Sequence, residues 1–334
     1  MKSTTNVTWQ NGECPAAICN TGRPLSSQSL SLKGALGSLY LLSSHGKGIL
    51  RAQLLILQWL KKRLSSENVA WIVEKAALLS AGVPERLVFM TFSAATRYSG
   101  KIPLALTETE LALAASISPG WRPTDWTTDE AARIFLLLAL PATPASAALM
   151  DQIYHTADVG EAVAMQKALA ILPAPDGHLA RAREGLRNNI QAVFEAVSLR
   201  NPYPALHFDT LGWNQLVVKT VFLGLPVGEI ANLESRMNPE LSRMLDDLAQ
   251  ERWSAGRTFV PELWRCVGPY ADARALGHLG KVLVEGKVAE KQAAALALNS
   301  CSDPLADTIL NGYPDLAAQV RNGTLTWENF NHGT

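Results

Sequence analysis

The stretch "TTDEAARIFLLLALPATPASAALMDQIYHTADVGE" (residues 127–161) decides the fold class. Thr127 and Asp158 each stand three residues before a glutamate, the capping-box pattern that satisfies free amide groups at a helix start. Between them, Pro144 follows Thr143, and proline suits the first helical position after such a cap. Residues 131–140 are apolar all round, which predicts a helix buried on every side. Short helices separated by short breaks are therefore expected here.

Similar signals continue outward in both directions. Residues 49–64 read as a helix, and Thr107–Glu110 forms another capping box. Further helix starts are expected near Asp176, Asp209, Pro226, Asn238, Pro261, Asp272, Lys287 and Pro304. No run alternates apolar and polar residues with period two, so the sequence predicts roughly fifteen short helices and no sheet.

Two segments show the apolar stripe of a half-buried helix. The first is predicted as one helix whose stripe is Leu186, Ile190, Val193, Phe194 and Val197. The second carries its stripe at Leu241, Met244, Leu245 and Leu248. In both segments the spacing points one face toward a core.

Short connections favour antiparallel neighbours, so the expected fold is all-α, built from short antiparallel helix pairs. The pairs would stack as a HEAT-like α-solenoid or form a compact orthogonal helical array. Residues 258–322 resemble degenerate HEAT-like repeats. Residues 1–28 are polar and without period, which predicts a disordered tail before a single helical domain over residues 29–334.

Composition excludes several classes of protein. The 334 residues are 48% hydrophobic with a formal net charge of zero, and the longest basic run is Lys61–Arg63, which argues against nucleic acid as a partner. The apolar stretches are too short to span a bilayer, and the N-terminus lacks a signal-peptide pattern. The scattered cysteines favour a reducing cytoplasm over a zinc site or a disulfide framework; they are Cys14, Cys19, Cys266 and Cys301.

The common catalytic and nucleotide-binding motifs are absent from the sequence. It contains no GxGxxG, GxxxxGK[ST], HExxH or GxSxG pattern. We therefore expect neither a cofactor nor a metal.

"RNPYPALHFDTLGWNQ" (residues 200–215) is the stretch with most polar chemistry. Its prolines end the preceding helix near Leu199, and Asp209 or Thr210 can cap the next one, so a joint between helices explains it. The alternative is a ligand site that lines the main concave pocket, with His207 and Asp209 as candidate acid and base. The residues offered for binding are Asn201, Tyr203, His207, Trp213 and Asn214.

Two further groups have functional alternatives. "DDLAQE" (residues 246–251) supplies Asp246, Asp247 and Glu251, which resemble the magnesium motif of terpene synthases. The leucine stripe of the same helix faces the core, so we expect these acids on the solvated face. Arg97 beside Tyr98, and Arg257 near Trp253, are candidates to clamp an anionic or aromatic ligand, although such pairs more commonly fasten loops.

Several stretches together resemble the EboA family across about residues 49–330. They are "FSAATRYSGKIPLALTETEL" (92–111), "GWRPTDWTTDEAARIFLLLALP" (120–141), "TADVGE" (156–161), "VSLRNPYPALHFDTLGWNQLVVK" (197–219) and "NPELSRMLDDLAQERWSAGR" (238–257). The resemblance implies a bacterial protein of metabolite traffic, encoded in a gene cluster linked to the export of secondary metabolites. Neighbouring genes of that cluster include a membrane prenyltransferase.

Two functions follow from this resemblance. The first is a non-catalytic helical protein that binds a pathway metabolite or partner proteins of the same cluster, with peripheral association with the membrane prenyltransferase as one expected contact. The second is an enzyme of that pathway, acting on a polar or prenylated intermediate with His207 as acid or base. An enzyme needs an enclosed pocket in which His207 meets a second titrating group, whereas a binding protein needs only a groove.

Overall fold

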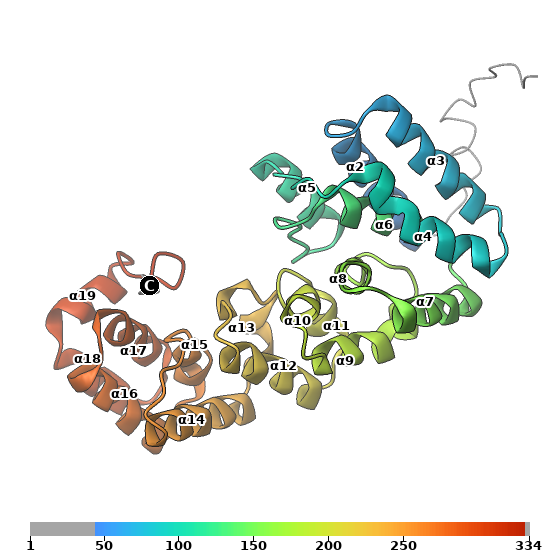
Figure 1. Cartoon of the computed structure of the whole chain (residues 1–334). Helices are drawn as coiled ribbons and strands as arrows, with labels where there is room; N and C mark the ends of the chain where they lie inside the picture. Colours follow the sequence, from blue (N-terminus) through green and yellow to red (C-terminus); the bar gives the residue numbers. More distant parts are fainter. Residues whose placement is uncertain (1–43, 331–334) are drawn as a thin grey trace, which may run out of the picture. The chain divides into compact units, whose positions relative to one another are not determined.

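A computed structural model describes residues 44–330, with side chains from Gly48 onward, and these residues belong to one compact unit, Leu42–Thr334. The tail predicted over residues 1–28 lies outside the described residues. Figure 1 shows the described chain as a succession of helices. Within residues 44–330, the only β pairing is a single antiparallel bridge between Pro103 and Thr127. The prediction of an all-α fold is confirmed.

The described chain has 18 α-helices, of which α11, α13 and α15 are only four or five residues long. The first half comprises α2 (Ser44–Lys61), α3 (Ser66–Ser80), α4 (Glu85–Ser99), α5 (Glu108–Ile117), α6 (Thr128–Leu137), α7 (Pro144–Thr156), α8 (Val159–Ala168), α9 (Leu179–Arg187) and α10 (Gln191–Ser198). The second half comprises α11 (Tyr203–His207), α12 (Thr210–Phe222), α13 (Leu233–Arg236), α14 (Pro239–Ser254), α15 (Leu263–Val267), α16 (Ala273–Glu285), α17 (Val288–Ser300), α18 (Pro304–Asn311) and α19 (Pro314–Arg321). Three 3₁₀ turns are η1 (Pro175–His178), η2 (Val227–Glu229) and η3 (Gly268–Tyr270).

Side-chain caps set many of these helix starts. The three predicted capping boxes are present at α5, α6 and α8. Thr143 and Asn238 cap α7 and α14 immediately before a proline, as the sequence predicted. Each cap satisfies amide groups that the first helical turn leaves without a partner. The local sequence therefore determines where these helices begin.

The helix that was predicted to be apolar all round is buried all round. Every residue from Ala131 to Leu140 is buried, including Arg133. The Arg133 guanidinium donates to Asp129 over 2.8 Å, and both side chains are almost fully buried. A buried charge needs such a partner because desolvation would otherwise be costly. Helix α6 contacts α2, α3, α4 and α8, which places it at the centre of its neighbours.

The core consists of two clusters that meet at α8–α10. One contains apolar side chains from Ala52 to Ala196, and the other runs from Leu169 to Phe330. Helix α10 serves both, because Val193 and Ala196 pack into the first while Phe194 and Val197 pack into the second. Helices pack mainly on neighbours that are close in sequence, such as α16 on α17 and α14 on α15.

One predicted helix is in fact two. The stripe from Leu186 to Val197 is broken between α9 and α10, and Ile190 is 46% exposed instead of facing the core. Asn188 takes an extended backbone at the break, and its side chain accepts from the amide of Ile190 over 2.8 Å. Asparagine competes with helix hydrogen bonds in this way. The prediction of a continuous helix here was wrong.

Candidate functional site

The stretch 200–215 forms an ordered joint. Asn201, 4% exposed, donates through its side-chain amide to the carbonyls of Gln166 and Ala196, each over 3.0 Å, and accepts from the amide of Tyr203. These contacts use both the donor and the acceptor of its amide group. Asn201 thereby ties α8, α10 and α11 together.

Tyr203 and His207 lie on one face of α11. The Tyr203 hydroxyl donates to the carbonyl of Pro175 over 2.5 Å, and burial raises the pKa of this phenol. The His207 ring lies 4.6 Å from the Tyr203 ring, centroid to centroid, and partial burial lowers the pKa of His207. Among the described residues, the His207 imidazole has no hydrogen-bond partner.

The remaining residues of the stretch also have local partners. Asp209 caps α12 by accepting from Gly212 over 2.8 Å and forms an ion pair with Arg183. Asn214, 1% exposed, exchanges side-chain hydrogen bonds with Asn238. The fully buried Trp213 lies under the guanidinium of Arg236, 5.1 Å from the ring centre. The joint thus fastens α12 to the start of α14.

The two arginines predicted as ligand clamps are exposed, and other side chains contact their aromatic neighbours. Arg97 is exposed on α4, while the adjacent Tyr98 stacks on Trp71 with ring centres 3.8 Å apart. Arg257 is exposed in the loop after α14, and the cation over Trp253 is Lys281, 5.2 Å from the ring centre. Clamping by either arginine stays a prediction.

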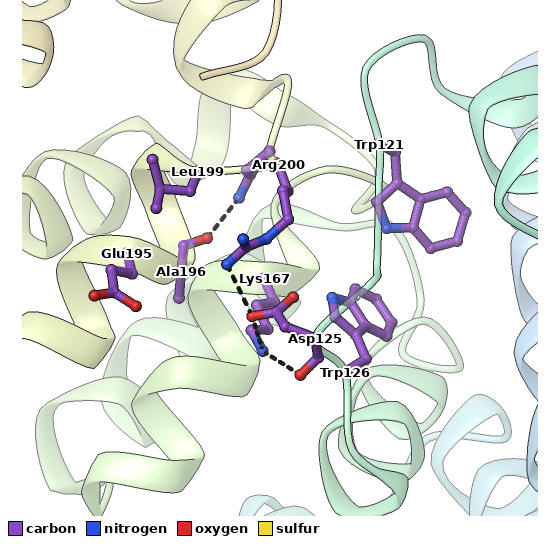
Figure 2. Close-up of a pocket in the computed structure, with 9 residues that line it drawn as sticks. Trp121, Asp125, Trp126, Lys167, Glu195, Ala196, Leu199 and Arg200 are labelled. Carbon is purple, nitrogen blue, oxygen red and sulfur yellow. Dashed lines mark hydrogen bonds and ion pairs between the residues drawn. The ribbon is translucent and has the colours of Figure 1, made fainter. Parts of the chain in front are cut away.

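Three charged side chains, Asp125, Lys167 and Arg200, lie together where the two core clusters meet, and we call them the charged cluster. Figure 2 shows Arg200, Asp125 and Lys167 converging beside the indoles of Trp121 and Trp126. Asp125 accepts from Lys167 over 2.9 Å and from Arg200 over 3.2 Å. The hollow that they line has a volume of about 10 Å³, enough for about one water molecule. Arg200 and Asn201 line it, but a metabolite does not fit.

The charged cluster makes two further ion pairs. Lys167 pairs with Glu130, the glutamate of the α6 capping box, and Arg200 pairs with Glu229 over 2.8 Å. Arg200 has φ of 56°, a left-handed conformation that costs energy for a residue with a side chain. Burial alone would raise the pKa of Asp125, yet Lys167 and Arg200 outweigh it and lower the pKa. The carboxylate therefore stays ionised and holds the strained arginine in place.

A larger cleft lies beside α14, α16 and α17. Its volume is about 250 Å³, just below the roughly 300–1,000 Å³ typical of ligand pockets. Its lining residues are Trp253, Phe259, Trp264, Lys281, Val282, Glu285, Gly286 and Glu290. We call this space the aromatic cleft. Its lining combines three aromatic side chains and Val282 with three charged side chains, Lys281, Glu285 and Glu290.

The aromatic wall is built by the turn that follows α14. Gly256 adopts φ of 65° after the helix ends at Ser254, and the amide of Arg257 donates back to the carbonyl of Arg252 over 2.8 Å. This left-handed turn suits glycine and reverses the chain. It brings the Phe259 ring to 5.5 Å from the Trp253 ring, centre to centre.

The three aromatic rings of the wall contact one another, and one of them is fully buried. Trp264 is fully buried on α15, and its ring centre lies 5.9 Å from those of both Trp253 and Phe259. Trp253 and Phe259 are only partly buried, so they offer surface to a ligand. The charged lining comes from α16, where Lys281 and Glu285 are half exposed or more, with 3.9 Å between Nζ and the carboxylate. The carboxylate of Glu290 accepts a hydrogen bond from the backbone amide of Lys287 at the start of α17.

Asp246 corrects a prediction. We expected Asp246, Asp247 and Glu251 on a solvated face, but Asp246 is 1% exposed. Its carboxylate accepts from Nδ1 of His278 over 2.7 Å and pairs with Arg274 over 2.8 Å. Asp246 lies at the edge of the single buried face of α14, where His278 and Arg274 of α16 reach it. Glu251 is exposed, as predicted, and Asp247 is partly exposed. Sequence reasoning missed the polar partners because they lie on another helix.

The described part of the chain gives no support to a magnesium site at these acids. No group of three or more His, Cys, Asp or Glu side chains in it could hold a metal ion. The acids at positions 246 and 247 both pair with Arg274.

Sequence reasoning also missed the charged side of the cleft. His278, Lys281, Val282 and Glu285 follow the spacing i, i+3, i+4 and i+7, which places them on one face of a helix. That spacing could have predicted that these four side chains lie side by side. Nothing in the sequence, however, indicated that the aromatic residues of 253–264 face it.

A family model described as "Metabolite traffic protein EboA" matches residues 52–268. The chain belongs to the EboA family. No curated protein and no solved structure matches the chain. The match confirms the predicted resemblance and ends in η3, so the EboA-matched segment supplies the aromatic wall of the cleft but not its charged side. None of the helices in residues 44–330 is long and apolar enough to cross a membrane.

Proposed function

We propose that this EboA-family chain is a non-catalytic binding protein of metabolite traffic and that it holds a small, flat, apolar metabolite in the aromatic cleft. The observation that carries the proposal is the aromatic wall itself. Trp253 and Phe259 present partly exposed rings beside a volume of about 250 Å³. Aromatic faces bind flat ligands through burial of apolar area and offset stacking.

The charged side of the cleft supports binding of a ligand with a polar end. Lys281 and Glu285 of α16 line the same cleft and are half exposed or more, so they can meet a ligand without losing much solvation. The ammonium group of Lys281 lies over the Trp253 ring and would leave that face when a ligand stacks there. An apolar body with one polar group would satisfy both sides. This composition fits an intermediate of secondary metabolism, handled in the cytoplasm and passed to proteins of the same gene cluster, including a membrane prenyltransferase.

The alternative of a pathway enzyme depends on His207. Its ring contacts Tyr203, and it lines neither the hollow at Arg200 nor the aromatic cleft. Asp209, its candidate partner in the sequence, is engaged by Gly212 and Arg183. Binding in the aromatic cleft needs no role for His207, so we prefer it.

The experiment is native mass spectrometry of the full chain purified from cells that carry the whole gene cluster. The wild-type protein should retain a small molecule, and Trp253→Ala should lose it because the exposed ring of the wall is gone. Trp71→Ala is the matched control: this tryptophan is also partly buried, but it stacks on Tyr98 in the α3–α4 pair, away from the cleft. Retention of the same ligand by Trp253→Ala would contradict the proposal.

A further inference from the structure

A buried carboxylate holds a histidine beside Trp253, one of the rings that line the aromatic cleft. Asp246 on α14 is 1% exposed, and His278 on α16 lies with Nδ1 2.7 Å from its carboxylate. Arg274 pairs with the other carboxylate oxygen over 2.8 Å and also reaches Asp247. Arg274 is thus shared between two carboxylates, and the bond from His278 to Asp246 fixes the orientation of the ring.

The contact also decides where the proton of a neutral His278 ring lies. An ionised carboxylate only accepts hydrogen bonds, so Nδ1 must carry the hydrogen. The second ring nitrogen, Nε2, is then left with a lone pair and acts as an acceptor. No residue in the described range donates to Nε2, and the side chain is 19% exposed. The ring thus keeps one acceptor for a molecule from outside.

His278 belongs to the face of α16 that lines the cleft. It stands one turn before Lys281 and Val282, both of which line the cleft. The rings of His278 and Trp253, which is partly exposed, form a T-shaped pair with 5.5 Å between centres. A flat ligand stacked on Trp253 would therefore lie next to the edge of the imidazole.

We propose that Asp246 positions His278 so that its Nε2 accepts a hydrogen bond from the ligand, and that the cleft selects flat aromatic molecules carrying a hydroxyl or N–H group. This ligand class rests on the proposed function of the aromatic cleft as a binding site. Glu285 and Glu290 agree with it, since both add acceptors to the same cleft. A ligand that offers a donor satisfies these groups, whereas one that offers only acceptors does not.

Three probes of similar size separate the alternatives in equilibrium binding to the full chain. They are 2-naphthol, which donates, 2-methoxynaphthalene, which does not, and 2-naphthoate, which is an anionic acceptor. One hydrogen bond predicts roughly five- to tenfold tighter binding of naphthol than of methoxynaphthalene. Equal binding of these two would overturn the inference and leave the cleft as a binding site. Tightest binding of naphthoate would show that a cation of the cleft, the imidazolium or Lys281, selects the ligand instead and would also overturn it. Failure of all three would remove the proposed function as well.

Variants test whether His278 and Asp246 cause the preference for naphthol over methoxynaphthalene. His278→Asn keeps a donor for Asp246 but has no atom at the Nε2 position, so the preference for naphthol should fall to about one. His155→Asn is the matched control, because His155 is a 65% exposed histidine at the end of α7. A naphthol preference that persists in His278→Asn would contradict the assignment.

A spectroscopic reading separates positioning from folding. Nitrogen NMR of the wild-type imidazole should show the Nδ1–H tautomer, and naphthol should shift Nε2 while methoxynaphthalene should not. Asp246→Asn should weaken the tautomer preference and the naphthol preference together. If His278→Asn fails to fold, the wild-type spectra still decide, since an Nε2 resonance unmoved by naphthol overturns the inference.

Discussion

At the scale of single residues, His178 is a histidine whose contacts require it to be neutral. Arg181 donates to its Nδ1 over 2.7 Å, and arginine has only donors, so the proton of the ring must lie on Nε2. That nitrogen donates to the carbonyl of Pro173 over 2.9 Å. Burial, and then the charge of Arg181, lower the pKa of His178 to about 4. A protonated ring would place two cations in contact.

This contact predicts acid sensitivity. Unfolded, His178 titrates near its usual pKa of about 6.5, so between pH 6.5 and 4 the unfolded chain binds a proton that the folded chain does not. The contribution of His178 to stability is therefore full above pH 6.5 and lost as the pH falls, by up to about 3 kcal/mol. His178→Gln can accept from Arg181 and donate to Pro173 without titrating. Urea unfolding from pH 7.5 to 4.5 should show a flatter dependence for the variant; parallel curves would contradict the assignment.

Polar side chains near the core show what the sequence leaves open. The partners of Asn201, Asp246 and Arg181 come from other helices, and no local pattern names them. The cap at Asp209, by contrast, joins residues three apart and was predictable. A residue's type sets which hydrogen bonds it needs, but the packing of helices decides which groups supply them.

At the scale of elements, helix starts were predictable and helix packing was not. Side-chain caps act within four residues, so α5, α6, α7, α8, α12 and α14 begin where the sequence indicates. The break at Asn188 was missed because the apolar spacing continues across it. The burial of Asp246 was missed because its partners, His278 and Arg274, lie on α16.

Glycine at the crossing of η3 and α17 supplies a prediction at this scale. A Cβ at Gly268 would collide with the carbonyl of Ala297 and lie 2.5 Å from Oγ of Ser300. Backbone cannot move aside cheaply, so Gly268→Ala should lower the free energy of unfolding by about 2–3 kcal/mol. Gly277 within α16 has open space, so Gly277→Ala should raise it by about 0.5–1 kcal/mol. Denaturant unfolding of the pair checks both signs, and a neutral Gly268→Ala would show that η3 shifts freely.

At the scale of the whole molecule, the EboA-matched segment ends inside a shared core. Residues 52–268 include Leu245 and Trp264, which belong to the same buried cluster as Leu279 and Leu298 of the following helices. Helix α17 contacts α15, α16, α18 and α19, so it occupies a central place in that cluster. The segment that defines the family and the helices after it therefore fold against one another.

This shared core predicts that the EboA-matched segment does not fold alone. A chain ending at Tyr270 would expose the apolar faces of α14 and α15, including Leu241, Leu263 and Trp264, all fully buried in the full chain. The free energy lost when so much apolar area becomes exposed exceeds the marginal stability of a domain. This truncated chain should therefore aggregate or show no cooperative melting transition. Removing residues 1–28, which carry no apolar period in the sequence, should leave the melting temperature nearly unchanged. Calorimetry of both truncations beside the full chain compares the two. A cooperative transition in the chain that ends at Tyr270 would contradict the prediction, because α16–α19 would then be an addition to a fold that is stable without them.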